Sequence, residues 1–230
     1  MEKEAFVYQV FEQIAGDYDA ANDRISLGLH RRWKRQAVRQ MLPLLPQGAR
    51  VLDLCCGTGD MTALLLESRP DLRVCALDFS PAMLRAAQAR FGAEARVELR
   101  AGNALALPYP ENSMDGAVIS FALRNTADYT RVLREMMRVC RRGAPICVID
   151  SFVPGSHVIR PFYRVYFSLV MPLLGGGQKH RREYRWLNES TEQFLSPGAL
   201  AAQMRACGLL IRSTKRFMCG SCVSICAQEK

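Results

Sequence analysis

Two carboxylates stand at the ends of two predicted strands, where they could bind a cationic or hydroxyl-rich ligand. Asp53 lies in the apolar run 51–56 and is followed by Gly57-Thr58-Gly59. The glycines of this turn lack a Cβ, so the backbone can bend sharply and approach a ligand closely. Asp78 ends a second apolar run, 25 residues after Asp53. This pattern is typical of nucleotide-binding folds, which serve many functions.

The residues after the glycine turn distinguish between two cofactors. The dinucleotide fingerprint G-x-G-x-x-G needs glycine or alanine at position 62, which is Thr62, and Asp60 repels a pyrophosphate. NAD is therefore the second choice. S-adenosylmethionine has no phosphate, and its ribose diol and cationic amino acid tail suit carboxylates. We predict that Asp78 accepts hydrogen bonds from both ribose hydroxyls and that Asp53 faces the tail.

Further positions after predicted strands complete the expected cofactor site. Asn103 and Ala104 follow the third strand, where an amide and a small side chain can border an adenine. Ser120 lies at the end of the fourth strand, near the expected reaction centre. The full set of expected cofactor-binding residues is Asp53, Gly57, Thr58, Gly59, Asp78, Phe79, Asn103, Ala104 and Ser120.

Alternating strands and helices must position these residues. Apolar runs predict strands at 51–56, 73–78, 95–102, 116–123 and 144–150. Helical spacing of apolar residues predicts helices after the first, second and fourth strands, and Ser80-Pro81 is a typical helix start. A last helix and two strands are predicted at 197–207, 209–217 and 221–228. This alternation predicts an α/β fold with a mostly parallel sheet, helices on both faces and ligands at the carboxyl ends of the strands.

The length of 230 residues and a hydrophobic content of 49% suit one domain. Its predicted parts are an N-terminal helical cap (1–45), a cofactor-binding core (46–151), a helical insertion on the substrate side (152–195) and a C-terminal helix with strands (196–230).

The net charge of +9 is concentrated near the C-terminus, where residues 151–230 hold 11 basic and 4 acidic residues. Such an excess suits nucleic acid, an anionic membrane or water alone. The sequence has no apolar run long enough for a membrane span, and its acidic start is unlike a secretory signal, so we expect a cytoplasmic protein. The nine cysteines are expected to be reduced, and the spacing of Cys219, Cys222 and Cys226 does not favour a metal site.

Blocks along nearly the whole chain resemble the ubiquinone/menaquinone biosynthesis C-methyltransferases of the UbiE type. They are VFEQIAGDYDAANDRISLGLHRRWK (10–34), VLDLCCGTGD (51–60), LDFSPAML (77–84), GNALALPYPENSMD (102–115), ISFALRN (119–125) and EYRWLNES (183–190). The resemblance implies a Rossmann-like class I methyltransferase fold with a seven-stranded sheet, and C-methylation of a lipid-tailed quinol. The cofactor residues that it implies are Thr58, Asp78, Asn103, Ala104 and Ser120. The C-terminal MCGSCVSICAQEK departs from the family pattern, so the acceptor is less firmly implied than the donor.

Carbon methylation of a quinol needs a group that favours the phenolate, because the pKa of a phenol is about 10. Arg124, beside Asn125, can stabilise the oxyanion directly or through water. His30 is the best candidate for a base, although a surface histidine in a basic helix is an equal alternative. Tyr184 and Tyr18 could donate hydrogen bonds to the quinol, although packing is the commoner role of buried aromatic residues.

Three other functions remain open at this point. A nucleic-acid methyltransferase would carry a base-flipping motif, and none is present, so nucleic acid is not expected as a partner. A non-catalytic cofactor-binding protein would tolerate loss of the glycine turn or of the ribose acid, and both are intact. A methyltransferase for another small molecule is the strongest alternative.

The apolar, aromatic and basic stretch 157–185 suggests where a lipid tail would enter. Its uncharged run from Val165 to Gln178 has fourteen residues, fewer than the roughly twenty that cross a bilayer. A buried core helix is one interpretation. The other is a mobile wall, hinged at Gly175-Gly176-Gly177, that contacts an anionic membrane and accepts the tail of a prenylated quinol. A homodimer is also kept open.

Overall fold

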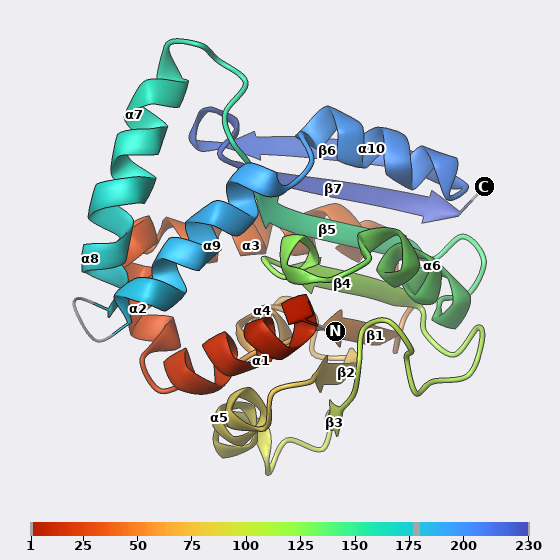
Figure 1. The fold of residues 1–230 in the computed structure, drawn as a ribbon. Coiled ribbons are helices and arrows are strands. Elements are labelled where there is room, and N and C mark those ends of the chain that lie inside the picture. The colour runs from red at the N-terminus through yellow and green to blue at the C-terminus, as the bar shows by residue number, and fades with distance from the viewer. Residues whose placement is uncertain (1, 177–179, 230) are drawn as a thin grey trace.

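The fold is built on one twisted sheet of seven strands, which the computed structural model shows within the residues that it describes, 2–176 and 180–229 (Figure 1). The strands are β1 (Arg50–Leu54), β2 (Arg73–Asp78), β3 (Val97–Ala101), β4 (Gly116–Ser120), β5 (Pro145–Ser151), β6 (Leu209–Phe217) and β7 (Cys222–Glu229). Their order is β3-β2-β1-β4-β5-β7-β6. Strands β1 to β5 are parallel, and β7 pairs antiparallel with both β5 and β6.

Helices cover both faces of the sheet, which is why the central strands are apolar on both sides. Successive side chains of a strand point to opposite faces. Leu52 packs in the core under α6 (Tyr129–Val139) and α10 (Pro197–Ala206). Val51 packs in the other core, under α3 (Leu29–Met41), α4 (Asp60–Ser68) and α5 (Pro81–Phe91). Asp53 therefore shares the face of Val51.

A third group of helices caps the carboxyl ends of the parallel strands (Figure 1). It consists of α1 (Glu2–Ile14), α2 (Tyr18–Ser26), α7 (Ile159–Val165), the π-helix η3 (Tyr166–Val170), α8 (Met171–Gly176) and α9 (Arg181–Gln193). Ile14 and Tyr184 are fully buried in its core, so the N-terminal helices and the insertion hold each other in place. Three short 3-10 turns complete the part of the chain that the structure describes: η1 (Leu42–Leu44), η2 (Leu123–Asn125) and η4 (Met218–Gly220).

The sequence predicted the order of the elements, and the structure corrects several of their boundaries. The first strand ends at Leu54 rather than at residue 56, because Cys55 has a left-handed backbone (φ 56°). The fourth strand ends at Ser120 rather than at residue 123, because Phe121 has a left-handed backbone (φ 55°) and η2 follows. The third strand is shorter than 95–102. The start of α5 is as predicted, since the Ser80 hydroxyl accepts a hydrogen bond from Met83 N at 3.2 Å.

The run that begins at Val165 is not a buried core helix. Val165, Leu169 and Leu173 are 56%, 61% and 62% exposed, whereas Met171 is buried on the opposite side. Of the predicted hinge, Gly175 and Gly176 end α8, and Gly177 lies outside the described residues. None of the described helices is long and apolar enough to cross a bilayer.

Candidate active site

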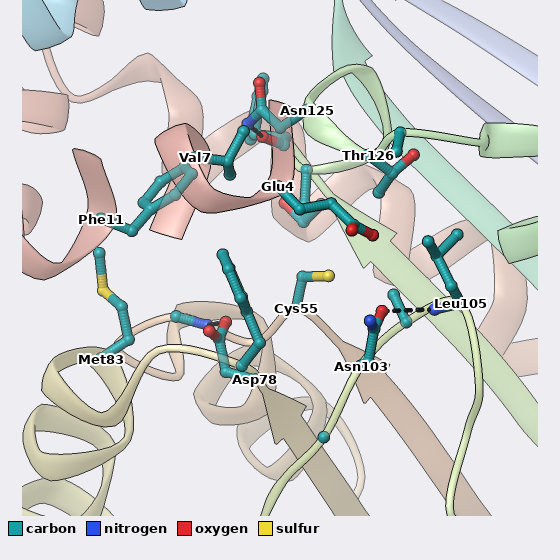
Figure 2. Close-up of a pocket in the computed structure, with 18 of the residues that line it drawn as sticks. Glu4, Val7, Phe11, Cys55, Asp78, Met83, Asn103, Leu105, Asn125 and Thr126 are labelled. Carbon is teal, nitrogen blue, oxygen red and sulfur yellow. Dashed lines mark hydrogen bonds between the residues drawn. The ribbon is translucent and has the colours of Figure 1, made fainter. Parts of the chain in front are cut away.

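A cavity lies at the carboxyl ends of β1, β2 and β4, beneath helix α1 (Figure 2). Of the predicted cofactor residues, the following line it: Gly57, Asp78, Phe79, Asn103, Ala104 and Ser120. Helix α1 closes the cavity with Glu4, Val7 and Phe11. The structure thus brings together strand-end residues that are up to 63 positions apart in the chain, from Gly57 to Ser120, because parallel strands end at one edge.

Asp78 joins the turns that follow the first two strands. Its Oδ2 accepts a hydrogen bond from Gly57 N at 2.8 Å, and its Oδ1 accepts one from Ser80 N at 2.9 Å. Burial raises the pKa of this carboxyl, and the backbone hydrogen bonds oppose that shift. Each oxygen keeps a further lone pair, so Asp78 can still accept the hydroxyls of a ribose.

The glycine turn is shaped for a close approach. Gly57 and Gly59 both have positive φ, and a Cβ on Gly59 would lie 2.3 Å from the Phe91 ring. Thr58 is buried and its hydroxyl donates to Asp19 at 2.7 Å, so it fixes the turn to α2. Neither Thr58 nor Gly59 is among the lining residues.

Asp53 lies beside the turn rather than on the cavity wall. Its Oδ2 accepts a hydrogen bond from the Thr62 hydroxyl at 2.6 Å. Its Oδ1 is buried and has no partner among the described residues. Burial raises the pKa of Asp53 to about 7. An ammonium group would satisfy the unpaired oxygen and favour the ionised form.

Other buried polar atoms at the cavity also lack partners within the described part of the chain. They are the Ser120 hydroxyl oxygen and the Asn125 amide oxygen. A buried polar atom without a partner is costly, and a polar ligand would remove that cost. The amide oxygen of Asn103 instead accepts from Leu105 N at 2.8 Å, which fixes the side chain at the wall (Figure 2).

A second, larger cavity adjoins the first. The two share Phe11, Tyr18 and Phe121, so a ligand in one would meet a ligand in the other across these rings. Its wall is mainly apolar and aromatic, with side chains from α2, α3, α7, η3 and α9. Of the predicted catalytic residues, His30, Arg124 and Tyr184 line this second cavity, while Asn125 lines the first.

Arg124 is held by a buried carboxylate. Its Nη1 donates to Asp150 Oδ1 at 2.5 Å and to the Phe121 carbonyl at 2.7 Å, and its backbone N donates to Asp150 Oδ2 at 3.1 Å. Its Nε is buried and has no partner among the residues described. The guanidinium therefore has a fixed position and an unused donor.

His30 and Tyr184 have different surroundings. The Nδ1 of His30 lies 2.7 Å from the Ser26 hydroxyl, and its Nε2 lies 3.5 Å from Asp60 Oδ2. Both ring nitrogens thus face protein groups, and its role as a base stays a prediction. The hydroxyls of Tyr184 and Tyr163 are buried without a partner in the described residues. Burial raises the pKa of both, so they remain donors.

Several residues of the site were not predicted. Cys55 and Phe121 follow strand ends with positive φ values of 56° and 55°, conformations that cost energy in non-glycine residues and occur at functional sites. Lys34 and Asp150 also escaped prediction. A lysine in a basic helix gave no signal for the second cavity, which Lys34 lines, and an aspartate in an apolar strand gave none for its contact with Arg124.

The strand order, the glycine turn after β1 and the carboxylate after β2 define a class I S-adenosylmethionine-dependent methyltransferase. A model of the ubiE/COQ5 methyltransferase family matches residues 1–228, and the chain belongs to that family. Proteins named demethylmenaquinone methyltransferase from Listeria monocytogenes serotype 4a and Geobacillus stearothermophilus are 40% and 38% identical to it. The matches cover 90% and 95% of this chain, and 88% and 94% of theirs.

Solved structures of lower sequence identity share the fold. The complex of the Haloferax volcanii Trm112 methyltransferase activator with a methyltransferase gives a TM-score of 0.70 at 16% identity, covering 95% of this chain and 96% of the other. An S-adenosylmethionine-dependent methyltransferase from Aquifex aeolicus gives 0.63 at 16% identity, covering 88% and 92%. The predicted fold class is thus confirmed.

We expect Asp78→Ala to weaken binding of S-adenosylmethionine by about 1.5–3 kcal/mol, because the ribose hydroxyls lose a charged acceptor. Calorimetric titration measures this directly. Glu67→Ala, which removes an exposed carboxylate from α4, is the matched control and should bind normally. An unchanged affinity in the Asp78 variant would contradict the assignment.

We also expect the affinity for S-adenosylmethionine to rise as the pH increases through about 7. Below the raised pKa of Asp53 its carboxyl is protonated and neutral, and it then attracts an ammonium group less. Titrations between about pH 6 and 8 test this, since Asp53→Asn should bind weakly and lose the pH dependence. A wild-type affinity that is flat across this range would remove Asp53 from the donor site.

Proposed function

We propose that the protein transfers a methyl group to a ring carbon of demethylmenaquinol, a naphthoquinol with a prenyl tail. The observation that carries this proposal is the large aromatic cavity joined to the cofactor cavity, with the Arg124 guanidinium fixed on its wall. The name of relatives at 38–40% identity, demethylmenaquinone methyltransferase, supports the same acceptor. A fused ring with an apolar tail suits a wall of this kind.

The bound S-adenosylmethionine supplies an electrophilic methyl group. The acceptor hydroxyl first loses its proton, and the neighbouring ring carbon would then take the methyl group as the methyl–sulfur bond breaks, which leaves S-adenosylhomocysteine. The hydrogen of that carbon leaves as a proton and the oxygen is protonated again, so one proton is released overall. The unpaired Nε of Arg124 can stabilise the oxyanion, and the hydroxyls of Tyr184 and Tyr163 can orient the ring.

The function can be tested on cells and on purified protein. Cells that lack the protein should accumulate a quinone that is one methyl group lighter, as detected by mass spectrometry of a lipid extract. Purified protein with S-adenosylmethionine should methylate reduced demethylmenaquinone. Failure of both results would favour the alternative of another small-molecule acceptor.

Arg124→Ala should lower turnover by about 10²–10³-fold, the effect expected for loss of one oxyanion donor. Its affinity for S-adenosylmethionine should stay close to wild type, because Arg124 does not line the cofactor cavity. Steady-state kinetics and donor titration together separate the two effects. Arg131→Ala, an exposed residue of α6, serves as the control. Full turnover in the Arg124 variant would exclude it from the mechanism.

The second cavity would hold the methyl acceptor and is called the acceptor cavity below. The residues at its mouth support peripheral contact with an anionic membrane. Leu27, Phe162 and Met218 line the cavity and are also strongly exposed. An exposed apolar stripe continues from the mouth along α7, η3 and α8, at Val158, Phe162, Val165, Leu169 and Leu173. Two exposed arginines lie close in sequence to residues of the mouth: Arg32 is five positions after Leu27, and Arg216 is two positions before Met218. Apolar side chains bordered by basic ones suit the interface of an anionic bilayer.

The basic flanks that the sequence suggested play a smaller part in this proposal. Arg164 lies 3.7 Å from Glu192, and the Arg182 guanidinium lies over the Phe6 ring. Lys179 lies outside the described residues. The homodimer also stays a prediction, which analytical ultracentrifugation would test.

Co-sedimentation should show binding to vesicles that contain anionic lipid and not to neutral vesicles, with loss of binding at high salt. The double variant Phe162→Ser, Leu169→Ser should release the protein, because it removes apolar side chains from the stripe. Leu210→Ser is the matched control, since Leu210 is an exposed leucine on β6. Equal binding of both variants would contradict contact through the stripe, and no binding by the wild type would contradict membrane contact.

A further inference from the structure

Lys34 is a buried lysine on the wall of the acceptor cavity. It comes from α3 and its side chain is 9% exposed. Its Nζ lies 3.0 Å from Asp60 Oδ2 and 5.9 Å from the centroid of the Phe121 ring. Phe121 belongs to the wall shared by the two cavities. The ammonium group is thus close to the place where acceptor and cofactor would meet.

Asp60 holds this ammonium group from behind the wall. It is the first residue of α4, and its other oxygen lies 3.1 Å from Arg90 Nη1. Burial opposes ionisation, but hydrogen bonds from His30, Lys34 and Arg90 hold the pKa of Asp60 well below its usual range. The carboxylate is therefore ionised and shared among several donors. It does not line the cavity, so it leaves the cavity side of Lys34 available.

The charges on the wall have one sign. Lys34 and Arg124 line the acceptor cavity, whereas no aspartate or glutamate is found among its lining residues in the described chain. Their counter-ions, Asp60 and Asp150, stand behind them. Besides the two cations, the titratable groups that face this cavity are His30, Tyr18, Tyr163, Tyr166, Tyr184, Cys219 and Cys222. A low-dielectric cavity with cations alone on its wall favours an anionic ligand.

The two cations act on the same region. Burial raises the pKa of the Tyr18 hydroxyl, and the charges of Lys34 and Arg124 both oppose that shift. Tyr18 lies on the shared wall, so both cations are near the junction of the cavities. They come from different elements, since Lys34 belongs to α3 and Arg124 to η2.

We infer that Lys34 is a second catalytic cation of the acceptor site, which stabilises the phenolate of the quinol together with Arg124. This inference rests on the proposed function. The phenolate is the form whose ring carbon attacks the methyl group. It must form in the cavity near neutral pH, although the pKa of a free phenol is about 10. Two fixed cations within reach of one oxyanion lower that barrier more than either alone.

The experiment measures ionisation of a bound acceptor analogue, which needs no turnover. 1-Naphthol, whose absorption changes on ionisation, is titrated with pH in a complex of the full-length protein with S-adenosylhomocysteine. The wild type should lower the pKa of bound naphthol by about 1–3 units relative to water, as neighbouring opposite charges do. Lys34→Met should remove about one unit of that shift. Lys34→Arg should retain most of it.

Arg90→Met is the matched control. Arg90 also contacts Asp60, but its side chain is 41% exposed and lines neither cavity. A purely structural role of the Asp60 cluster would make the Lys34 and Arg90 variants alike. Donor titration checks that Lys34→Met is folded, because Lys34 does not line the cofactor cavity.

The rate of quinol methylation gives a second readout. Its rise with pH should move to higher pH in Lys34→Met, by the same amount as the naphthol titration, and stay in place in Arg90→Met. Naphthol that titrates equally in wild type and Lys34→Met would overturn the inference alone. A wild type that neither binds naphthol nor methylates the quinol would overturn the proposed function and the inference with it.

Discussion

The two hydrogen bonds that Asp78 accepts, from Gly57 N and Ser80 N, fix the geometry on which the site depends. They join the turn after β1 to the turn after β2, and these turns start α4 and α5. The position of Asp60 at the start of α4 follows from this connection, and so does the position of Lys34, which Asp60 holds. The positions of the cofactor cavity and of the acceptor wall relative to the sheet therefore both depend on Asp78.

Most of the fold could be predicted because its strands and helices are marked by local sequence patterns. Apolar runs marked the strands, and Ser80-Pro81 marked the start of α5. Six of the nine expected cofactor residues line the first cavity for the same reason, since they lie at or just after strand ends that meet at one edge. Residue 121 shows the limit. A phenylalanine after an apolar strand predicts more strand, and only the tertiary structure holds it in a left-handed conformation.

The acceptor cavity was less predictable because its wall comes from distant segments. Helices α2, α3, α7 and α9 all contribute to this wall, and the packing of the cap around Ile14 and Tyr184 holds α1, α2 and α9 together. Lys34 appears in the sequence as one of several basic residues in a helix, and its burial depends on Asp60, 26 positions later. Arg124 could be singled out, but Asp150, which fixes it, looks like the end of an ordinary apolar strand.

The acceptor cavity has a direction. Its mouth is formed by the exposed apolar residues Leu27, Phe162 and Met218, and its inner wall carries Lys34 and Arg124. This change from an apolar mouth to a cationic inner wall favours one orientation of an amphiphile. Its polar head is stabilised at the inner end, and its apolar chain is stabilised near the mouth. A reversed molecule would place hydrocarbon against the Lys34 ammonium and the Arg124 guanidinium. The cavity thus aligns a long ligand by polarity before any specific hydrogen bond forms.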